Sequence, residues 1–203
     1  MSSAFWDQRY SNADLAYGEA PNEFLVNMAD RLPKGGDALD IGAGEGRNAL
    51  YLASRGLNVL AVDQSEVGMR KALLRARDRG LNLHARAVDL RDFEAEPGSL
   101  DVVSSIFVHL PSALRAAVHR RIAAWLKPGG LFLLEAYAPD QLQRSTGGPK
   151  DPDMLASLET IVDELTAEGR LAVEHQAALV RNVSEGQFHT GEASVVQVLA
   201  RKK

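Results

Sequence analysis

The alternation of short apolar runs with helix-like segments constrains the fold of this chain more than any other feature. Runs rich in valine, isoleucine and leucine predict five strands, at residues 37–42, 58–63, 82–89, 100–107 and 131–137. Segments with helical spacing are found at residues 47–56, 65–80, 112–126 and 153–169. This order is typical of an α/β fold with a mainly parallel sheet and helices on both faces.

The C-terminal part predicts a hairpin instead of another crossover. Two further strands are predicted at residues 171–183 and 189–201, joined by the short segment SEGQ. A link this short leaves no room for a crossover helix, so the two strands should be antiparallel. The chain shows no internal repeat, and its 203 residues suit one domain. We expect a single domain over residues 1–203, with residues 1–36 preceding a core of residues 37–203.

Composition narrows the classes of protein to consider. With 45% hydrophobic residues, 25% charged residues and a net charge of −4, the chain is typical of a soluble globular protein. The charge argues against a protein whose main task is to coat nucleic acid. The absence of cysteine excludes disulfides, thiolate metal sites and a cysteine nucleophile, and no histidine or acidic spacing suggests a metal site. Without a signal pattern or a membrane-length apolar stretch, we expect a cytoplasmic protein without membrane contact.

A glycine-rich segment, DIGAGEGR, follows the first predicted strand at residues 40–47. In an open parallel sheet the first strand-to-helix turn is a ligand-binding position, and glycine lets the backbone approach the ligand closely. The dinucleotide fingerprint needs a third glycine where this chain has Arg47, and no phosphate-binding P-loop is present. The segment therefore argues against a nicotinamide- or flavin-dependent oxidoreductase.

Acidic residues end the first three predicted strands, namely Asp40, Asp63 and Asp89. Asp63 follows the first strand by about 20 residues, where a carboxylate can accept hydrogen bonds from ribose hydroxyls. A carboxylate at Asp40 would repel a pyrophosphate but attract a sulfonium or ammonium group. The three acids favour a cationic nucleoside as the ligand; the alternative is that they only cap the helices that follow.

These motifs resemble those of the class I S-adenosylmethionine-dependent methyltransferases. The resemblance is carried by ALDIGAGEGRNALYLA, VLAVDQS, AVDL and LKPGG. Residues 5–25, 137–149 and 185–202 resemble the tellurite-resistance and thiopurine-methyltransferase-like branch. The resemblance implies a Rossmann-like, seven-stranded sheet with an inserted antiparallel last strand. It also implies S-adenosyl-L-methionine as methyl donor and S-adenosyl-L-homocysteine as product.

The resemblance also assigns cofactor-binding roles by position. The methionine half of the cofactor would contact Asp40, Gly42, Ala43, Gly44 and Gly46. The ribose would contact Asp63, Gln64 and Ser65, the adenine Asp89 and Leu90, and the sulfonium Ile106 and Phe107. Residues 1–36 would form a lid that covers the cofactor with Trp6, Arg9, Tyr10 and Tyr17. Arg9 suits the cofactor carboxylate as a forked donor, whereas Trp6 and Tyr10 have the alternative of packing a helix onto the sheet.

Two histidines are candidate general bases for methyl transfer. His109 lies just beyond the fourth predicted strand, and histidine titrates in the useful range; the alternative is that it caps the next helix. His189 corresponds to an active-site histidine of the tellurite-resistance enzymes, but Thr190 replaces the arginine that follows it there. His189 is equally well interpreted as a plain hairpin residue. Tyr137 and Gln141 are candidates for the acceptor pocket.

The acceptor is the least constrained part of the interpretation. The Asn/Asp-Pro-Pro-aromatic motif of enzymes that methylate exocyclic amino groups is absent from SIFVHLP at residues 105–111. A small molecule, in particular one with a soft sulfur, selenium or tellurium nucleophile, is the expected acceptor. A non-catalytic S-adenosylmethionine-binding module and an RNA or protein methyltransferase are the alternatives. The basic segment 70–80 is interpreted as a solvated helix face, although with Arg115, Arg120 and Arg121 it also offers a patch for RNA.

Overall fold

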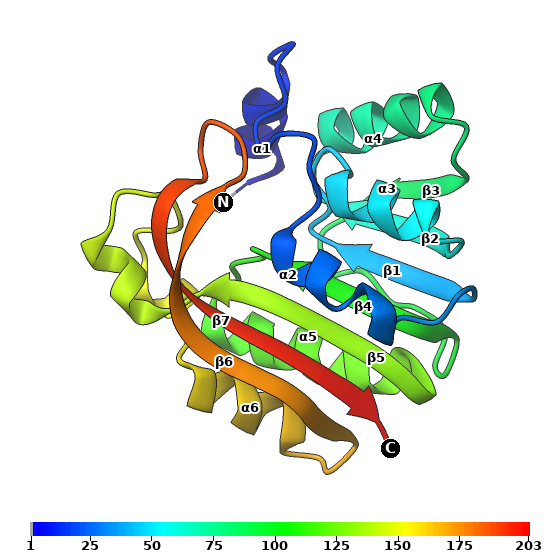
Figure 1. The fold of residues 1–203 in the computed structure, drawn as a ribbon, viewed down its shortest axis with the longest axis vertical. Coiled ribbons are helices and arrows are strands. Elements are labelled where there is room, and N and C mark those ends of the chain that lie inside the picture. The colour runs from blue at the N-terminus through cyan, green and yellow to red at the C-terminus, as the bar shows by residue number, and fades with distance from the viewer. Residues whose placement is uncertain (1) are drawn as a thin grey trace.

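The computed structural model describes residues 2–203 and contains one sheet. Its strands are β1 Asp37–Ile41, β2 Asn58–Asp63, β3 Leu83–Ala87, β4 Leu100–Ile106, β5 Leu126–Tyr137, β6 Leu171–Ser184 and β7 Thr190–Lys202. The sheet order is β3-β2-β1-β4-β5-β7-β6, in which the first five strands are parallel (Figure 1). Strand β7 is inserted between β5 and β6 and is antiparallel to both. The predicted fold class and its antiparallel last strand are confirmed.

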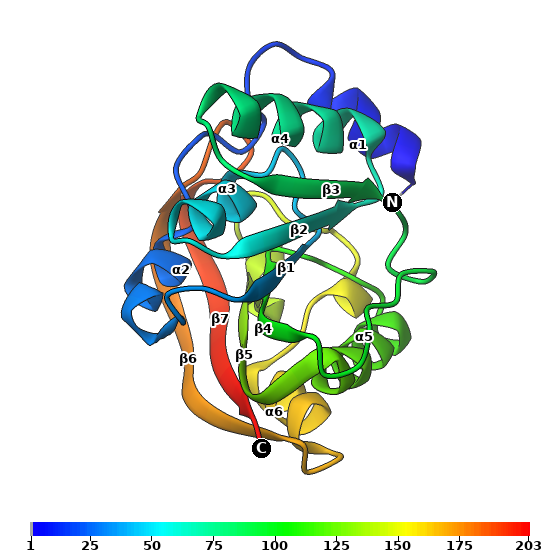
Figure 2. The same ribbon diagram turned by 90° about the vertical axis from the view of Figure 1, so that its right-hand side faces the viewer.

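The helices cover the sheet on two sides, as Figures 1 and 2 show. Helices α3 Arg47–Ser54 and α4 Glu66–Asp78 contact β1, β2 and β3, whereas α5 Ser112–Trp125 and α6 Leu158–Thr166 contact the strands β5, β6 and β7. Two helices precede the sheet, α1 Ser3–Tyr10 and α2 Glu23–Asn27. Among residues 2–203, no helix combines the length and apolar character needed to cross a membrane.

Strand β5 shows why the central strands are apolar on both faces. Leu131 and Leu133 pack with α3 and α4, while Phe132 and Leu134 pack with α5 and α6. Successive side chains of a strand point to opposite faces, so covering both faces requires an uninterrupted apolar run. Trp125 completes the second of these cores at the end of α5.

The boundaries differ from the predicted ones by one to three residues at several ends and by five residues at the starts of β5 and α6. The segment KPGG, expected to separate a helix from a strand, lies inside β5, where the pairing with β4 is irregular between Leu100 and Val102. Gly129 has a positive φ of 81° there, which favours glycine. Helix α6 begins only at Leu158 because Ser157 caps it, and Pro152–Met154 forms a separate 3-10 turn.

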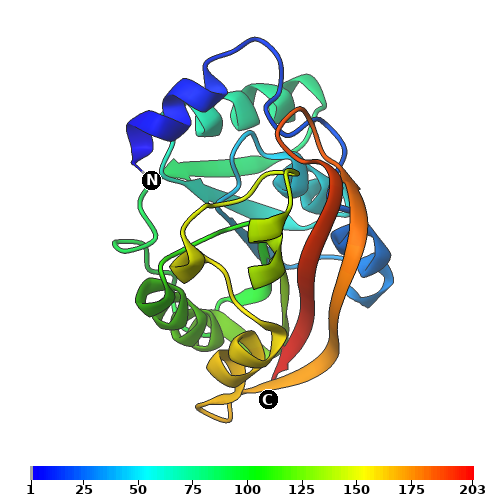
Figure 3. The same ribbon diagram turned by 90° about the vertical axis from the view of Figure 1, so that its left-hand side faces the viewer.

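The topology places one edge of the sheet in position to bind a ligand. The chain leaves β1 towards β2 and β3 on one side and returns to β4 on the other, so the strand order reverses between β1 and β4. Open parallel sheets bind ligands beyond the carboxyl ends of the strands at such a point. Figure 3 shows the side of the molecule opposite to that in Figure 2, where residues 138–157 and the turn between β6 and β7 lie near this edge of the sheet.

Candidate cofactor and acceptor site

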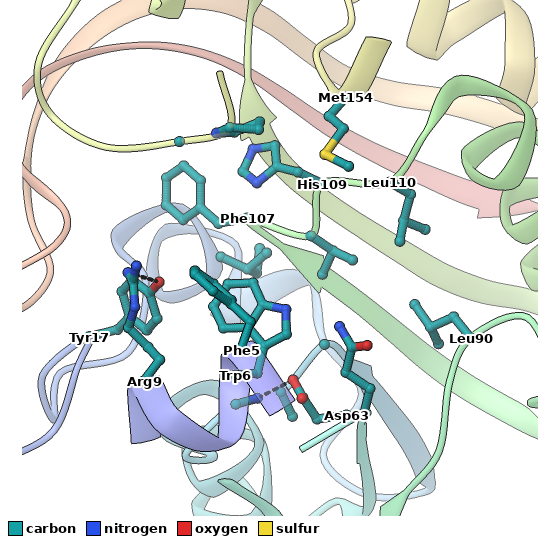
Figure 4. Close-up of a pocket in the computed structure, with 18 of the residues that line it drawn as sticks. Phe5, Trp6, Arg9, Tyr17, Asp63, Leu90, Phe107, His109, Leu110 and Met154 are labelled. Atoms are coloured by element: carbon teal, nitrogen blue, oxygen red, sulfur yellow. Dashed lines mark hydrogen bonds between the residues drawn. The ribbon is translucent and has the colours of Figure 1, made fainter. Parts of the chain in front are cut away.

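A cavity of about 790 Å³ opens at the carboxyl ends of β1, β2 and β4. Its size lies within the range of roughly 300–1,000 Å³ that is typical of small-molecule sites. The glycine loop after β1 and Asp63 after β2 form one end, and residues 107–114, 147–154 and 188–189 contribute the other. Figure 4 shows Asp63 on one side of Phe5 and Trp6, and Phe107 and His109 on the other.

The glycine loop has left-handed backbone at three positions. Gly42, Gly44 and Gly46 have φ values of 60°, 55° and 81°, where other residues are strained. A Cβ atom would lie 2.6 Å from a Val108 methyl at Gly42, and 2.7 Å from the Tyr10 hydroxyl at Gly44. The loop therefore needs glycine both for its conformation and for the close approach of the segments around it.

Asp63 joins the glycine loop to the start of α4. Its carboxylate accepts hydrogen bonds from the N–H of Gly44 and of Ser65, both at 2.9 Å, and burial raises its pKa. The side chain also lines the cavity. Ser65 does not: its hydroxyl donates to Asp7 and accepts from the N–H of Gly68, so it caps α4 and anchors α1.

Asp40 lies behind the glycine loop and does not line the cavity. One carboxylate oxygen accepts the Ser104 hydroxyl at 2.6 Å, whereas the other, Oδ2, is buried without a hydrogen-bond partner among residues 2–203. Burial raises the pKa of Asp40 to about 7. A buried carboxylate oxygen without a partner is unfavourable in the free protein, and a cationic ligand nearby would relieve this cost.

Residues 3–22, part of the segment 1–36 expected to form a lid, pack against the glycine loop and are called the lid below. The Trp6 and Tyr10 rings stack at 5.7 Å, and the Arg9 guanidinium donates to the Tyr17 hydroxyl at 3.2 Å (Figure 4). The same guanidinium lies 4.0 Å from the centre of the Phe188 ring. Arg9 makes no salt bridge within residues 2–203, which leaves its charge available to a ligand.

A buried polar network holds this lid in place. Arg47 donates to the carbonyl oxygen of Ala20 and forms an ion pair with Glu185 in the turn between β6 and β7. The Asn22 side chain donates to the same carboxylate at 2.9 Å. The arginine that replaces the third glycine of a dinucleotide fingerprint thus connects three segments: the glycine loop, the lid and the hairpin turn.

His109 is placed at the cavity but is already engaged. Its Nε2 accepts the N–H of Tyr137 at 3.2 Å, and its ring stacks on that of Tyr137 at 5.2 Å. Burial lowers the pKa of His109 to about 3. Taking a proton at Nε2 would break the bond to Tyr137, so the geometry does not favour His109 as a general base.

His189 projects from the β6–β7 hairpin into the same region. Its ring lies 4.5 Å from that of Tyr17 and 4.9 Å from that of Phe107, and its Nδ1 is buried without a partner among residues 2–203. Burial lowers the pKa of His189 to about 3, with a further contribution from the positive charges of Arg47, Arg9 and Arg181. The imidazole is therefore neutral near pH 7.

Phe107 is the only non-glycine residue among 2–203 with a positive φ, at 55°. Such a conformation costs about 1–3 kcal/mol and is common at functional sites. Its N–H donates to the Glu135 carbonyl at 2.7 Å, which supports the turn. The conformation places the ring in the cavity, 4.7 Å from Tyr137 and 4.9 Å from His189.

Most of the predicted site residues meet at this cavity. It is lined by Trp6, Arg9, Tyr10, Tyr17, Gly42, Ala43, Gly44, Asp63, Gln64, Asp89, Leu90, Ile106, Phe107, His109 and His189. Five of the predicted residues are not part of its lining: Asp40, Gly46, Ser65, Tyr137 and Gln141.

Tyr137 and Gln141 support the site from behind. Tyr137 is fully buried beneath Phe107 and His109. Gln141 donates to the carbonyl of Gly147 and accepts the N–H of Ser194, which ties the loop to β7. Asp89 lines the cavity but pairs with Arg91 at 2.7 Å, which holds its pKa low.

Several cavity residues carry no sequence signal that could have identified them. They are Phe5, Leu110, Leu114, Pro149, Met154 and Phe188. All are apolar residues to which the motifs assign no role, and only the folded chain brings them together. The basic segment of α4 is partly used inside the fold, since Lys71 pairs with Glu45 at 2.8 Å and Arg75 donates to the Glu45 carbonyl.

Comparison with known proteins finds similarity to methyltransferases over part of the chain. Residues 38–130 match the family model of a methyltransferase domain. The chain is 28% identical over 128 residues to the 2-heptyl-1-hydroxyquinolin-4(1H)-one methyltransferase of Mycobacteroides abscessus, covering 59% of this chain and 56% of that protein. It is 36% identical over 95 residues to a ubiquinone biosynthesis O-methyltransferase of Bordetella pertussis, covering 45% and 39%. The chain thus spans about half the length, or less, of these relatives.

Solved structures share the fold at low sequence identity. TehB from Haemophilus influenzae superposes with a TM-score of 0.72 at 18% identity, covering 99% of this chain and 67% of that chain. The [4+2]-cyclase SpnF superposes with a TM-score of 0.74 at 17% identity, covering 100% and 97%. Residues 38–130, with the glycine loop and strands β1 to β4, therefore match the methyltransferase-domain model, and the whole chain shares the Rossmann-like fold of these solved structures.

Proposed function

We propose that the protein is an S-adenosylmethionine-dependent methyltransferase that acts on a small molecule. The observation that carries this proposal is one continuous cavity, with the glycine loop and Asp63 at one end and a mainly apolar and aromatic compartment at the other. A donor and an acceptor bound at the two ends would meet beside Phe107. Holding two reactants in line is the main contribution that an enzyme makes to such a displacement.

The residues present fit the cofactor. Asp63 has lone pairs left for ribose hydroxyls, and the unpartnered Oδ2 of Asp40 suits the positive end of the methionine half. Arg9 has free donors for the carboxylate of that half. Asp89 and Leu90 would flank the adenine. Ile106 and Phe107 would lie at the sulfonium, where an aromatic ring favours a cation.

When bound, the cofactor would supply an electrophilic methyl group on a sulfonium. Its leaving group is a neutral thioether, which needs no acid to protonate it. The chain's own contribution is to hold the donor and the acceptor in position and to exclude water from the site. The lid covers the glycine loop, and the rings of Tyr17, Phe107 and His189 surround the junction of the two compartments. A closed, water-poor site strengthens the electrostatic interactions inside it.

The finer assignment to the tellurite-resistance branch, with a soft sulfur, selenium or tellurium acceptor, has the support of the fold shared with TehB. The names of the curated relatives support an organic acceptor, since they are methyltransferases of a hydroxyquinolinone and of ubiquinone biosynthesis. Because residues 3–22 cover the cavity and part of the basic face of α4 is engaged internally, we propose a small molecule ahead of an RNA or a protein.

A calorimetric titration with S-adenosylhomocysteine, with NADH as control, tests the cofactor. We expect binding of the first and none of the second. Transfer of a labelled methyl group to a panel of thiols, phenols, selenite, tellurite, amines and bulk tRNA tests the reaction. The fold shared with the cyclase SpnF shows that this scaffold also serves other chemistry, so cofactor binding without transfer to any acceptor would favour a binding module.

A further inference from the structure

We propose that the methyl acceptor is an apolar ring compound whose attacking oxygen or sulfur is already an anion when it binds. This inference rests on the proposed function above and names its substrate class. It is carried by the walls of the acceptor compartment, which is formed by residues 107–111, 113–114, 147–150, 154 and 188–189 together with Phe5 and Trp6. The compartment offers apolar surface for a ring but no group placed to remove a proton.

The wall is made of aliphatic and aromatic side chains from three parts of the chain. Leu110 precedes α5 and Leu114 lies in its first turn, Met154 ends the 3-10 turn that follows β5 in the chain, and Phe5 and Trp6 come from α1. Figure 4 shows Met154, Leu110 and His109 gathered at the end of the cavity away from Asp63. No serine, threonine, asparagine or carboxylate side chain from residues 2–203 lines this compartment. A strongly hydrated acceptor would lose its water without gaining hydrogen bonds there.

No general base is available in the compartment. His109 uses its Nε2 to accept the N–H of Tyr137. The Nδ1 of His189 is buried, and among residues 2–203 no carboxylate pairs with its ring to orient it as a general base, while the positive charges of Arg47, Arg9 and Arg181 oppose its protonation. Tyr17 keeps its proton, because burial raises its pKa. The three carboxylates that line the cavity, Glu45, Asp63 and Asp89, belong to its cofactor end, and Glu45 is held by Lys71.

The remaining charges favour an anion over a cation. The titratable and charged groups around the compartment are Arg9 and Tyr17 from the lid, Arg47 from α3, His109, Arg115 from α5, Tyr137 from β5, Lys150, Arg181 from β6, Glu185 and His189. Glu185 is paired with both Arg47 and Arg181, and Arg115 is paired with Glu164. Within residues 2–203, Arg9 and Lys150 are the cavity cations without a carboxylate partner. If Arg9 binds the cofactor carboxylate, Lys150 is left at the rim to face the acceptor.

The chemistry then balances without any proton transfer. A lone pair on the anionic oxygen or sulfur of the acceptor forms a bond to the methyl carbon. The bond from that carbon to the sulfonium breaks, and its electron pair stays on sulfur as a neutral thioether. The acceptor becomes a neutral methyl ether or thioether. The sulfonium cation and the acceptor anion become two neutral molecules, and a compartment of low dielectric favours this loss of charge. Methyl transfer to a neutral amine removes no charge, and a hydrated oxyanion would first lose its water.

The first test uses the acceptor's own ionisation. We would measure kcat/KM against pH for 4-nitrophenol, 4-cyanophenol and 4-chlorophenol, whose pKa values rise in that order, and for 4-chlorothiophenol. The midpoint of each profile should move with the pKa of the acceptor, by about one pH unit per pKa unit, because only the anion reacts. A midpoint that stays in place while the acceptor changes would identify an enzyme base and overturn the proposal.

The second test measures binding without turnover. With S-adenosylhomocysteine bound, 7-hydroxycoumarin should bind at least tenfold more tightly above its pKa than the uncharged ring compound coumarin. Leu114→Asn should weaken that binding about tenfold, as expected for a polar group placed against an apolar ring. Leu74→Asn, on the exposed face of α4, is the matched control, and melting curves show whether each variant is folded.

The two proposals fail in different ways. If S-adenosylhomocysteine does not bind, the proposed function itself is wrong. If it binds but tellurite, selenite or an aliphatic amine is methylated better than every phenol and thiol, only the acceptor class is wrong. The acceptor class is equally wrong if none of the ring anions binds or is methylated.

Discussion

Asp63 connects the glycine loop to α4 through two backbone hydrogen bonds and faces the cavity. In Asp63→Ala, the N–H of Gly44 loses its acceptor and the ribose loses a contact. We expect affinity for S-adenosylhomocysteine to fall by about 1–3 kcal/mol, the cost of leaving such groups unsatisfied. Calorimetric titration measures the loss, with the exposed Asp78→Ala as control. Unchanged affinity would remove Asp63 from the cofactor site.

Asp40 makes the stability of the free protein sensitive to pH. Its pKa is raised from 3.8 to about 7 because it is buried, against the opposing effects of Ser104 and Arg47. A carboxyl with a raised pKa in the folded state contributes stability that is complete below the unfolded pKa and is lost as pH rises through the folded pKa. Asp40→Asn, which cannot ionise, should therefore lose less stability than the wild type between pH 4 and 7.

Urea unfolding of the wild type and Asp40→Asn at several pH values measures this difference. Between pH 4 and 7, we expect the unfolding free energy of the wild type to fall by roughly 1–4 kcal/mol more than that of Asp40→Asn. The exposed Asp92→Asn serves as control for the loss of a surface charge. Parallel pH curves for the wild type and Asp40→Asn would contradict an ionisation of Asp40 near neutral pH.

His109 and His189 should stay neutral throughout the range in which a histidine base usually works. Burial lowers the pKa of both side chains to about 3. Their imidazole carbon signals in NMR should not shift between pH 5 and 8, whereas a histidine in a reference peptide titrates near pH 6.5. A titration of either signal in this range would restore that histidine as a candidate base.

At the scale of elements, the lid and the β6–β7 hairpin depend on each other through Glu185. This carboxylate is buried and binds Arg47, Arg181 and Asn22. Glu185→Gln would leave buried arginine charge uncompensated, which typically costs about 3–5 kcal/mol. We expect a lower melting temperature, and faster proteolysis within residues 11–20.

Glu168→Gln, at an exposed salt bridge with Arg170, is the matched control and should change neither property. Addition of S-adenosylhomocysteine should slow proteolysis of the lid in both variants if the lid closes over the ligand. Equal proteolysis of Glu185→Gln and the wild type would show that the network does not hold the lid.

The helices and strands also show which features can be predicted from neighbouring residues and which depend on distant ones. The predicted tight hairpin between β6 and β7 is confirmed, and the helix predicted from residue 65 has Ser65 as its N-cap, because a cap and a short turn depend on neighbouring residues alone. The segment KPGG was wrongly expected to end before β5. Its place in the sheet depends on pairing with β4, which is distant in the sequence.

For the whole molecule, a bound cofactor should raise stability by mass action, because it binds only the folded chain. At a hundredfold excess over Kd the gain is about 2.7 kcal/mol. For a chain of this length that raises the melting temperature by about 2–4 °C for each kcal/mol. Thermal unfolding with S-adenosylhomocysteine measures the shift, and NADH at the same concentration should give none. Equal shifts with both ligands would contradict the cofactor assignment.

The order of elements, the parallel sheet with its antiparallel hairpin and the glycine loop followed by Asp63 were determined by the sequence itself. These features depend on periodicity, turn length and backbone freedom, which are local properties of the chain. The residues at the cofactor end of the cavity could also be predicted from the sequence. They directly follow parallel strands, and the carboxyl ends of parallel strands lie at the same edge of the sheet.

Only the tertiary structure decided which side chains form the acceptor compartment and what they can do. Leu110, Met154 and Phe188 lie far apart in the sequence, and no motif assigns them a role, so nothing local identifies them as neighbours. His109 and His189 looked like bases because histidine usually titrates near neutral pH. Burial lowers the pKa of both side chains and so weakens them as bases, and the Nε2 of His109 is occupied by the N–H of Tyr137; both effects arise only in the folded chain.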